Sequence, residues 1–267
     1  MQKISRVTQQ RRPGRYNIYL DDEFFMAVDE KILIQYNLFK GTELTEAEIA
    51  EVTAAEFEQK AYIKGLTIAT GRLIAKKQLV LKLKQGDFPN DVIARVIDRL
   101  ENAGILDDQA YAQAYVASSI NAGKLGPKGI ARKLKTFGVD SNIIADALAD
   151  YPDDDQDEHI QKQIEKLFAK YHHQSRMLAQ QKVTQKLIQN GFDQQHFQPL
   201  IKAYLADFDQ DEQQAAEWEN LDREAQKLAD RYSQYTGWDF TRRFKTALYR
   251  RGFDGDLINQ WLSKNNK

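Results

Sequence analysis

Apolar and polar positions alternate in the same way along most of this chain. In four stretches, two adjacent residues are followed four positions later by a second adjacent pair, and all of these residues except His196 are apolar. The stretches are Val92/Ile93 with Val96/Ile97, Ile143/Ile144 with Ala147/Leu148, His196/Phe197 with Leu200/Ile201, and Leu257/Ile258 with Trp261/Leu262. Residues four apart lie on one side of an α-helix. Each stretch therefore predicts a helix with one apolar stripe.

Each of these helices follows a glycine, an apolar residue and an aspartate. The motif occurs as Gly138-Val139-Asp140, Gly191-Phe192-Asp193 and Gly252-Phe253-Asp254, and more loosely from Gly86 to Asp91. A glycine after a helix adopts the left-handed conformation that ends it, and the apolar residue packs back on that helix. The aspartate then caps the next helix. The glycines lie 52, 53 and 61 residues apart, a spacing that indicates stacked helical repeats.

Two further helices precede each glycine. The nearer one, the middle helix of its unit, is predicted over Arg72–Gln85, Pro127–Phe137, Ser175–Asn190 and Asp239–Arg251. The first helix is predicted over Ala55–Thr70, Asp107–Ala122, Asp154–Tyr171 and Glu212–Tyr235. Gly104-Ile105-Leu106-Asp107, Gly126-Pro127 and Gly237-Trp238-Asp239 mark boundaries between helices. The prediction is a mainly α-helical, elongated tandem array of twelve helices in four three-helix repeats, over residues 54–105, 106–152, 153–208 and 209–267.

The first 53 residues have a different pattern. Arg15–Leu20 alternates with a period of two, which predicts a strand, and Ile4–Thr8 and Phe24–Val28 are its candidate partners. A short helix is expected around Asp29–Tyr36, and Thr45 to Glu48 has the form of a capping box that opens another helix. We interpret residues 1–53 as a small β-meander with two short helices that packs on the first repeat.

Composition excludes several classes of protein. The 267 residues include no cysteine, which rules out disulfides and thiolate zinc sites. No apolar run approaches the roughly 18 residues of a membrane span, and the first residues lack the apolar stretch of a signal peptide. A cytoplasmic location and no membrane partner are therefore expected. No reactive constellation or Walker lysine motif indicates an enzyme or a cofactor, so neither is expected.

Charge is distributed very unevenly. The predicted middle helices hold 17 of the 38 basic residues and one of the 39 acidic residues, Asp239. Stacked repeats would place these helices in series and form a basic strip, the electrostatic footprint of a polyanionic or acidic partner. Solvated helix faces and favourable contacts with helix dipoles are the alternative explanation. That alternative does not account for the near-absence of acidic residues in all four segments, because the first turns of helices favour Asp and Glu.

The chain resembles the RecX family, the bacterial regulators of the RecA recombinase. The likeness rests on Gly104-Ile105-Leu106-Asp107-Asp108 followed by Tyr111, Ala112 and Tyr115, and on Gly126, Ile130, Leu134, Gly138 and Val139. Residues 4–44, with Arg12-Pro13-Gly14-Arg15-Tyr16 and Asp29-Glu30, resemble the amino-terminal extension of members from Gram-positive bacteria. Shorter family members have three repeats, so the fourth repeat departs from the minimal pattern.

The resemblance implies a regulator of DNA repair, recombination and the SOS response that is not an enzyme. RecX proteins bind the RecA–single-stranded DNA filament in its groove, block its extension or promote its disassembly, and bind DNA themselves. We expect a monomer that contacts the RecA filament, single-stranded DNA and also double-stranded DNA. The predicted contact residues are Arg72, Lys76, Lys77, Lys82, Lys128, Arg132, Lys133, Lys135, Arg242, Arg243 and Lys245.

Two other functions remain open. A general DNA-binding protein built from tandem three-helix units would also carry basic middle helices, would bind duplex DNA with a steep salt dependence and would need no RecA. A solenoid that binds only proteins would show little affinity for nucleic acid. The residue pattern alone supports a helical repeat protein with a polyanion-binding side, and RecA as its target comes from the resemblance.

Other candidate sites are weak. Gly126-Pro127-Lys128-Gly129 fits the loop of a KH domain but lacks the flanking strands. His159 and His172 form no convincing metal pair, and Asp153 to Asp157 lacks the glycine and glutamate of a calcium loop. The aromatic residues, Trp238 and Tyr249 among them, mostly follow the apolar stripes or the glycines. Core and inter-repeat packing is their favoured role over base stacking.

Overall fold

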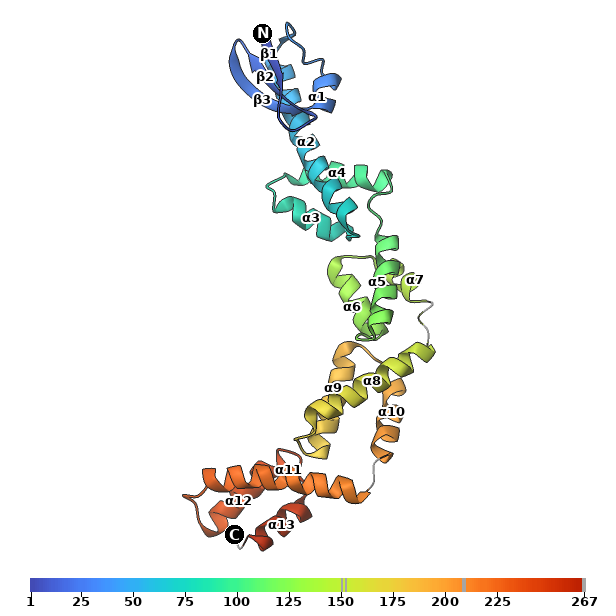
Figure 1. The fold of residues 1–267 in the computed structure, drawn as a ribbon, viewed down its shortest axis with the longest axis vertical. Coiled ribbons are helices and arrows are strands. Elements are labelled where there is room, and N and C mark those ends of the chain that lie inside the picture. Colours follow the sequence, from blue (N-terminus) through green and yellow to red (C-terminus); the bar gives the residue numbers. More distant parts are fainter. Residues whose placement is uncertain (150, 152, 208–209, 266–267) are drawn as a thin grey trace. The chain divides into compact units, whose positions relative to one another are not determined.

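The computed structural model describes residues 1–149, 151, 153–207 and 210–265. Its chain divides into two compact units, Met1–Ala112 with Thr136–Ile143, and Gln113–Lys135 with Ile144–Lys267. The described part contains thirteen helices and four strands, in agreement with the predicted fold class. Figure 1 labels the helices and the first three strands. No helix among the described residues combines the length and apolar character needed to cross a membrane.

The amino-terminal residues form a four-stranded antiparallel sheet in the order β3-β2-β1-β4. The strands are β1 (Gln2–Gln9), β2 (Arg15–Leu20), β3 (Glu23–Asp29) and β4 (Glu43–Leu44), with helix α1 (Glu30–Gln35) after β3. Ile18 and Leu20 of β2 are buried, as the alternation predicted. The three predicted strands are confirmed, whereas β4 was missed because two residues are too few to show an alternation.

Helix α2 (Glu46–Gly71) corrects one predicted boundary. Its capping box at Thr45 and Glu48 is confirmed, but the helix opened there and the predicted helix Ala55–Thr70 are a single element. The boundary between residues 53 and 54 therefore lies inside a helix. The physical reason is visible in the sequence, because no glycine or proline occurs between Glu46 and Lys64 to end the helix.

Buried charge joins α2 to the sheet. The Glu56 side chain is fully buried and accepts hydrogen bonds from Arg15 (2.6 Å) and from the backbone N–H of Asp29 (2.7 Å). Asp29 in turn caps α1 and accepts a hydrogen bond from Gln59 at 3.2 Å. A buried carboxylate is tolerated when it is paired and hydrogen-bonded. These contacts attach the sheet firmly to the first half of α2.

The remaining helices follow in four triplets, numbered here 1 to 4. Triplet 1 is α2 with α3 (Lys76–Lys84) and α4 (Asn90–Asn102), and triplet 2 is α5 (Asp108–Ala122), α6 (Pro127–Phe137) and α7 (Ser141–Leu148). Triplet 3 is α8 (Asp153–Tyr171), α9 (Arg176–Asn190) and α10 (Gln194–Ala206), and triplet 4 is α11 (Gln210–Arg231), α12 (Gly237–Tyr249) and α13 (Gly255–Lys264). Separate apolar cores fill triplets 1, 3 and 4.

The glycine motif behaves as predicted in the last three triplets. Gly138 and Gly191 have φ of 87° and Gly252 has φ of 81°. The apolar residues that follow them, Val139, Phe192 and Phe253, are buried. The aspartates next in sequence each accept a backbone hydrogen bond from the start of the following helix. The repeat therefore rests on a C-cap, an apolar anchor and an N-cap.

Two boundaries differ from the prediction. In triplet 1 the left-handed residue is Asp87 (φ of 59°), which follows Gly86, and Pro89 precedes α4 without a side-chain cap. Aspartate tolerates this conformation better than most residues with a side chain. In triplet 4, Gly237 begins α12 instead of ending α11, and Trp238 is 71% exposed instead of packed back.

Candidate polyanion interface

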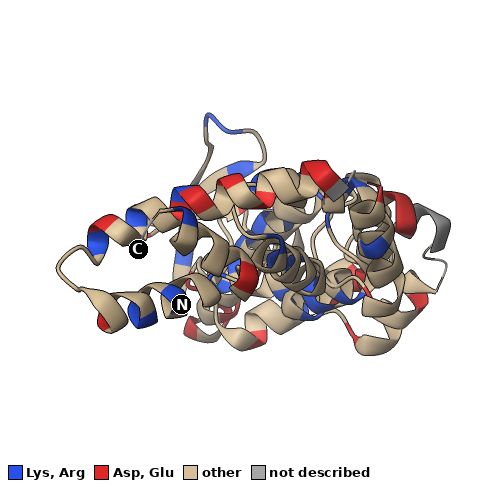
Figure 2. Ribbon diagram, turned by 90° about the horizontal axis from the view of Figure 1, so that it is seen from below, with Lys and Arg blue, Asp and Glu red and all other residues tan. Residues whose placement is uncertain are grey.

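Helix α12 presents its basic residues on the side opposite its core. Phe240, Phe244 and Leu248 recur every four residues and are buried. This spacing leaves Arg242 and Arg243 exposed and Lys245 half-buried. Figure 2 colours the positions of basic and acidic residues along the ribbon. Among the described residues no carboxylate lies within ion-pair distance of these three cations. The face can therefore meet an external anion without first breaking an internal pair.

Helix α6 divides its basic residues between two roles. Ile130 and Leu134 are buried, and Lys128, Arg132, Lys133 and Lys135 are all at least partly exposed. The Lys128 ammonium is paired with Asp193, and the Arg132 guanidinium donates to the backbone carbonyl of Gln189 at 2.5 Å. Neither Lys133 nor Lys135 has an ion-pair partner among the described residues.

The basic residues of triplet 1 are also divided. Arg72 lies outside the middle helix, contrary to the prediction, because it follows α2 as its C-cap residue. The Lys76 ammonium pairs with Glu101 at 2.7 Å. The Lys77 stem lies against Gly138, where an added Cβ would sit 2.6 Å from Lys77 Cβ. Lys82 belongs to the last turn of α3.

The side chains of Lys77, Lys128 and Arg132 lie where one triplet meets the next, whereas the Lys76 ammonium is paired within triplet 1. At each such joint, the first turn of a middle helix contacts the glycine that ends the next middle helix: Lys77 with Gly138, Gly129 with Gly191, and Ser175 with Gly252. Backbone N–H groups at a helix start and carbonyls at a helix end lack partners in their own helix. At the joint of triplets 2 and 3, the backbone N–H groups of Gly126 and Lys128 donate to the carbonyls of Asn190 and Gly191, which satisfies both.

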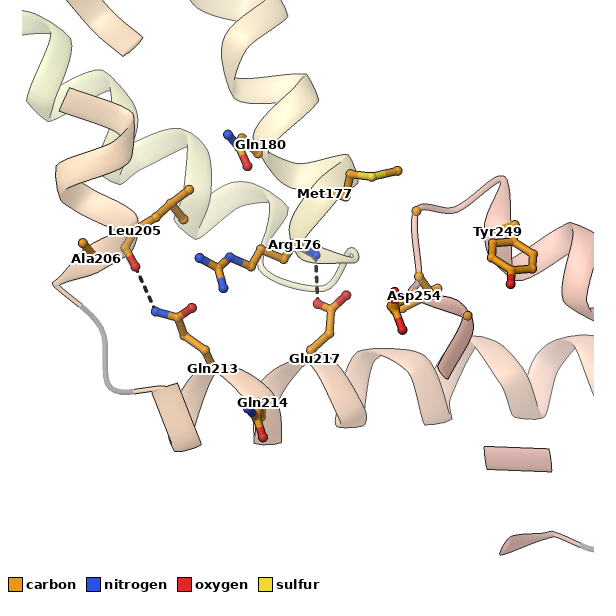
Figure 3. Close-up of a pocket in the computed structure, with 13 residues that line it drawn as sticks. Arg176, Met177, Gln180, Leu205, Ala206, Gln213, Gln214, Glu217, Tyr249 and Asp254 are labelled. Atoms are coloured by element: carbon orange, nitrogen blue, oxygen red, sulfur yellow. Dashed lines mark hydrogen bonds between the residues drawn. The ribbon is translucent and has the colours of Figure 1, made fainter. Parts of the chain in front are cut away.

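The joint between triplets 3 and 4 contains a cavity of about 900 Å³. Figure 3 shows two hydrogen bonds at its wall, from the Arg176 backbone N–H to the Glu217 carboxylate (2.8 Å) and from the Gln213 amide to the Leu205 carbonyl (2.9 Å). Arg176 thus contributes its backbone to the joint. Burial raises the pKa of Glu217, and the hydrogen bond from Arg176 opposes that rise.

At the other joints, one carboxylate has a raised pKa and another has a lowered pKa. Burial raises the pKa of Asp108, which accepts a hydrogen bond from the Lys76 backbone N–H at 2.8 Å. By contrast, hydrogen bonds from the Lys128 ammonium and the Gln195 backbone lower the pKa of Asp193. The joints therefore contain ionisable groups that respond to pH in opposite senses.

The structure thus separates the predicted contact residues into two groups. Lys77, Lys128 and Arg132 contact the next triplet through their side chains, whereas Lys76 does so through its backbone N–H, and its ammonium is paired inside triplet 1. The other predicted residues have no ion-pair partner in the described part of the chain: Arg72, Lys82, Lys133, Lys135, Arg242, Arg243 and Lys245. Sequence reasoning assigned Trp238 and Tyr249 to packing, but they are 71% and 54% exposed. The sequence could have indicated that Trp238 is exposed, because it lies two residues before Phe240 and therefore off the buried stripe of α12.

Metal-binding geometry is not found among the described residues, where no three His, Asp or Glu side chains converge as possible ligands. The adjacent rings of His172 and His173 lie 3.4 Å apart. Desolvation and the neighbouring His172 lower the pKa of His173.

Comparison with known proteins identifies the family. Models described as the RecX N-terminal domain, the second RecX three-helix domain and the third RecX three-helix domain match residues 2–45, 107–148 and 215–262. The regulatory protein RecX of Limosilactobacillus reuteri (strain DSM 20016) is 38% identical over 264 residues, 98% of each chain. This chain belongs to the RecX family.

Other RecX proteins extend the likeness. RecX of Oceanobacillus iheyensis is 33% identical over 274 residues, 99% of this chain and 98% of its own. A crystal structure of the regulatory protein RecX superimposes with a TM-score of 0.65 at 36% identity, and covers 76% of this chain and all of the other. The model of the third RecX domain falls on triplet 4. The predicted resemblance is thus confirmed, and with it a role as a regulatory protein.

Proposed function

We propose that this RecX-family protein regulates DNA repair and recombination by binding the RecA–single-stranded DNA filament in its groove. It acts as a cytoplasmic monomer without catalysis or cofactor. The observation that carries the proposal is the outward basic face of the middle helices, where Lys133, Lys135, Arg242, Arg243 and Lys245 lack internal ion-pair partners in the described chain. Clustered cations on one face are typical of proteins that bind polyanions.

The two groups of basic residues have different tasks in this proposal. Lys133, Lys135, Arg242 and Arg243 meet DNA phosphates or acidic recombinase side chains. Lys77, Lys128 and Arg132 hold neighbouring triplets together, and Lys76 stabilises triplet 1 through Glu101, so that the contact residues keep a defined spacing. Several contacts on one chain raise the effective concentration of each further contact. A protein of tandem triplets thereby binds a repetitive filament tightly through individually weak contacts.

RecA-dependent ATP hydrolysis on single-stranded DNA tests the proposal. The protein is titrated at substoichiometric ratios, and the wild type is expected to lower the hydrolysis rate. The variant K133E/K135E/R242E/R243E should need at least about tenfold more protein for the same effect, because reversed charges repel the filament. The control K166E/K202E changes exposed lysines on α8 and α10 and should behave as wild type.

The outcomes separate the competing functions. Hydrolysis that the wild type leaves unchanged would overturn the proposal. If duplex binding persisted in the same buffer, a general DNA-binding protein independent of RecA would replace it. Equal inhibition by the wild type and the four-site variant would instead reject these residues as the contacts.

A further inference from the structure

Trp238 has an unusual setting for a tryptophan. Its side chain is 71% exposed at the first turn of α12, although triplet 4 has an apolar core formed by Phe240, Phe244 and Trp261 among others. An aromatic ring of this size gains nothing from exposure to water, and exposed aromatic residues are enriched where a protein meets a partner. Trp238 is therefore available to stack against a binding partner.

Two arginines lie over neighbouring aromatic rings. The Arg242 guanidinium is 5.1 Å from the centroid of the Trp238 ring, and the Arg243 guanidinium is 4.4 Å from that of Tyr235. The Tyr235 ring also meets Tyr232 edge-on, with centroids 6.2 Å apart. Aromatic faces and cations therefore alternate over a short stretch of triplet 4.

We propose that Trp238 and Tyr235, with Arg242 and Arg243, form a base-stacking site for single-stranded nucleic acid. Non-specific single-strand binding needs two features, aromatic faces on which bases stack and cations that follow the phosphates. Both occur here within nine residues of sequence. The two arginines have no carboxylate partner in the described chain, so their charge is available to phosphate.

Other occupants fit less well. Two copies of this surface would bring Arg242 and Arg243 against the same residues of the second copy, and like charges repel. A membrane surface is disfavoured because polar residues surround Trp238 in the sequence, namely Gln234, Thr236 and Asp239. Duplex DNA keeps its bases paired and stacked, so it offers no base face to an indole ring. A single strand offers both base faces and phosphates.

This site adds a DNA contact to the proposed function, and its role in the filament rests on that proposal. Binding of a free single strand, however, can be measured without RecA. The probe is a fluorescein-labelled oligothymidylate, titrated with the full-length protein and followed by anisotropy. Trp238→Ala is expected to weaken binding by roughly fivefold to 100-fold, the usual effect of removing one aromatic stacking platform. Trp238→Phe should recover most of the affinity.

The matched control is Phe39→Ala, which removes another exposed aromatic ring (51% exposed) outside the site. It should bind the oligonucleotide as wild type does. The salt dependence separates stacking from charge. Trp238→Ala should leave the slope of log K against log salt unchanged, whereas Arg242→Gln/Arg243→Gln should reduce it by about 0.7 for each phosphate that no longer meets a cation.

A duplex of equal length distinguishes stacking from general damage to the surface. Trp238→Ala should change duplex affinity less than about twofold, because paired bases do not stack on the ring. Equal losses for duplex and single strand, or no loss for the single strand, would overturn the stacking site. Filament inhibition by the same variants is scored separately. If the wild type failed to inhibit RecA and Trp238→Ala still weakened oligonucleotide binding, the proposed function would fail and the stacking site would stand.

Discussion

The joint between triplets 2 and 3 is built from backbone, and the joint between triplets 3 and 4 is built from side chains. At the first, Gly126 N–H donates to the Asn190 carbonyl at 3.0 Å and Lys128 N–H donates to the Gly191 carbonyl at 3.2 Å. At the second, the Ser175 hydroxyl donates to the Arg251 carbonyl at 2.5 Å, and a cavity lies beside the contact. The glycine that ends each middle helix, Gly191 in one case and Gly252 in the other, thus belongs to two different kinds of interface.

The difference between the two joints indicates which substitutions each joint can accept. A backbone joint needs small residues on both sides, because Gly126, Gly129 and Gly191 are all in close contact. A side-chain joint needs one polar residue of the right length, and a neighbouring carboxylate can provide a second hydrogen bond, as Glu217 does for Arg176. We therefore expect substitutions at the first joint to cost more stability than substitutions at the second.

The largest effect should come from Gly191→Ala. An added Cβ would lie 2.7 Å from the Lys128 carbonyl carbon, and the residue has φ of 87°. Steric overlap and left-handed strain together should cost roughly 2–5 kcal/mol in the free energy of unfolding. Urea denaturation measures it. Gly104→Ala is the matched control, because Gly104 has φ of 66° but no atom near its Cβ, so it should cost about 1–2 kcal/mol.

Gly129→Ala should have the next largest effect. Gly129 is inside α6 with an ordinary helical φ, so alanine alone would favour the helix by about 1 kcal/mol. Its Cβ would, however, lie 2.9 Å from the Asn190 carbonyl carbon. We expect the overlap to dominate and a net loss of about 1–2 kcal/mol in thermal unfolding. A more stable variant would show that the joint opens without cost and would contradict the backbone description.

Ser175→Ala should cost about 1–2 kcal/mol, because it removes both the N-cap of α9 and the bond to Arg251. Chemical denaturation of the full chain is again the measurement. Ser263→Ala, at an exposed position, should stay within about 0.5 kcal/mol of wild type. Equal losses at Ser175 and Ser263 would remove Ser175 from the joint.

The smallest effect concerns pH and has opposite signs at the two joints. Burial raises the pKa of Glu217, so the folded state binds its proton more tightly, and stability from this group is lost as pH rises through the folded pKa. Glu217→Gln should therefore gain stability relative to wild type between about pH 4 and pH 7. Lys128 and Gln195 lower the pKa of Asp193, so stability from that group is lost as pH falls through its folded pKa. Because this happens below the ordinary aspartate value of about 4, Asp193→Asn should lose stability relative to wild type as pH rises from about 2 to about 4. Free energies of unfolding are measured across both pH intervals. Relative stabilities of Glu217→Gln and Asp193→Asn that change in the same direction with rising pH would refute this contrast.

Local rules explain what the sequence predicted well. Caps, apolar stripes and left-handed glycines act within a few residues, so four helix triplets and three strands could be derived without tertiary information. The split among the lysines could not, because the partner of Lys128 is 65 residues away in the next triplet. Arg72 was misplaced because α3 begins only at Lys76, and Arg72 is the C-cap residue of α2. The exposure of Trp238 likewise depends on how α12 meets its core.

Helix α2 sets the rotational phase between the amino-terminal sheet and triplet 1. Val52 and Glu56 face the sheet, whereas Ala61 and Gly65 face α4, all on one continuous helix. Inserting one residue between Glu56 and Ala61 would turn the two halves by about 100° and separate them by about 1.5 Å. An insertion of about seven residues, close to two full turns, would restore the phase and move the sheet about 10 Å further from triplet 1. Length variation in α2 is therefore restricted to near-whole turns, a constraint that does not apply to the loops between later triplets.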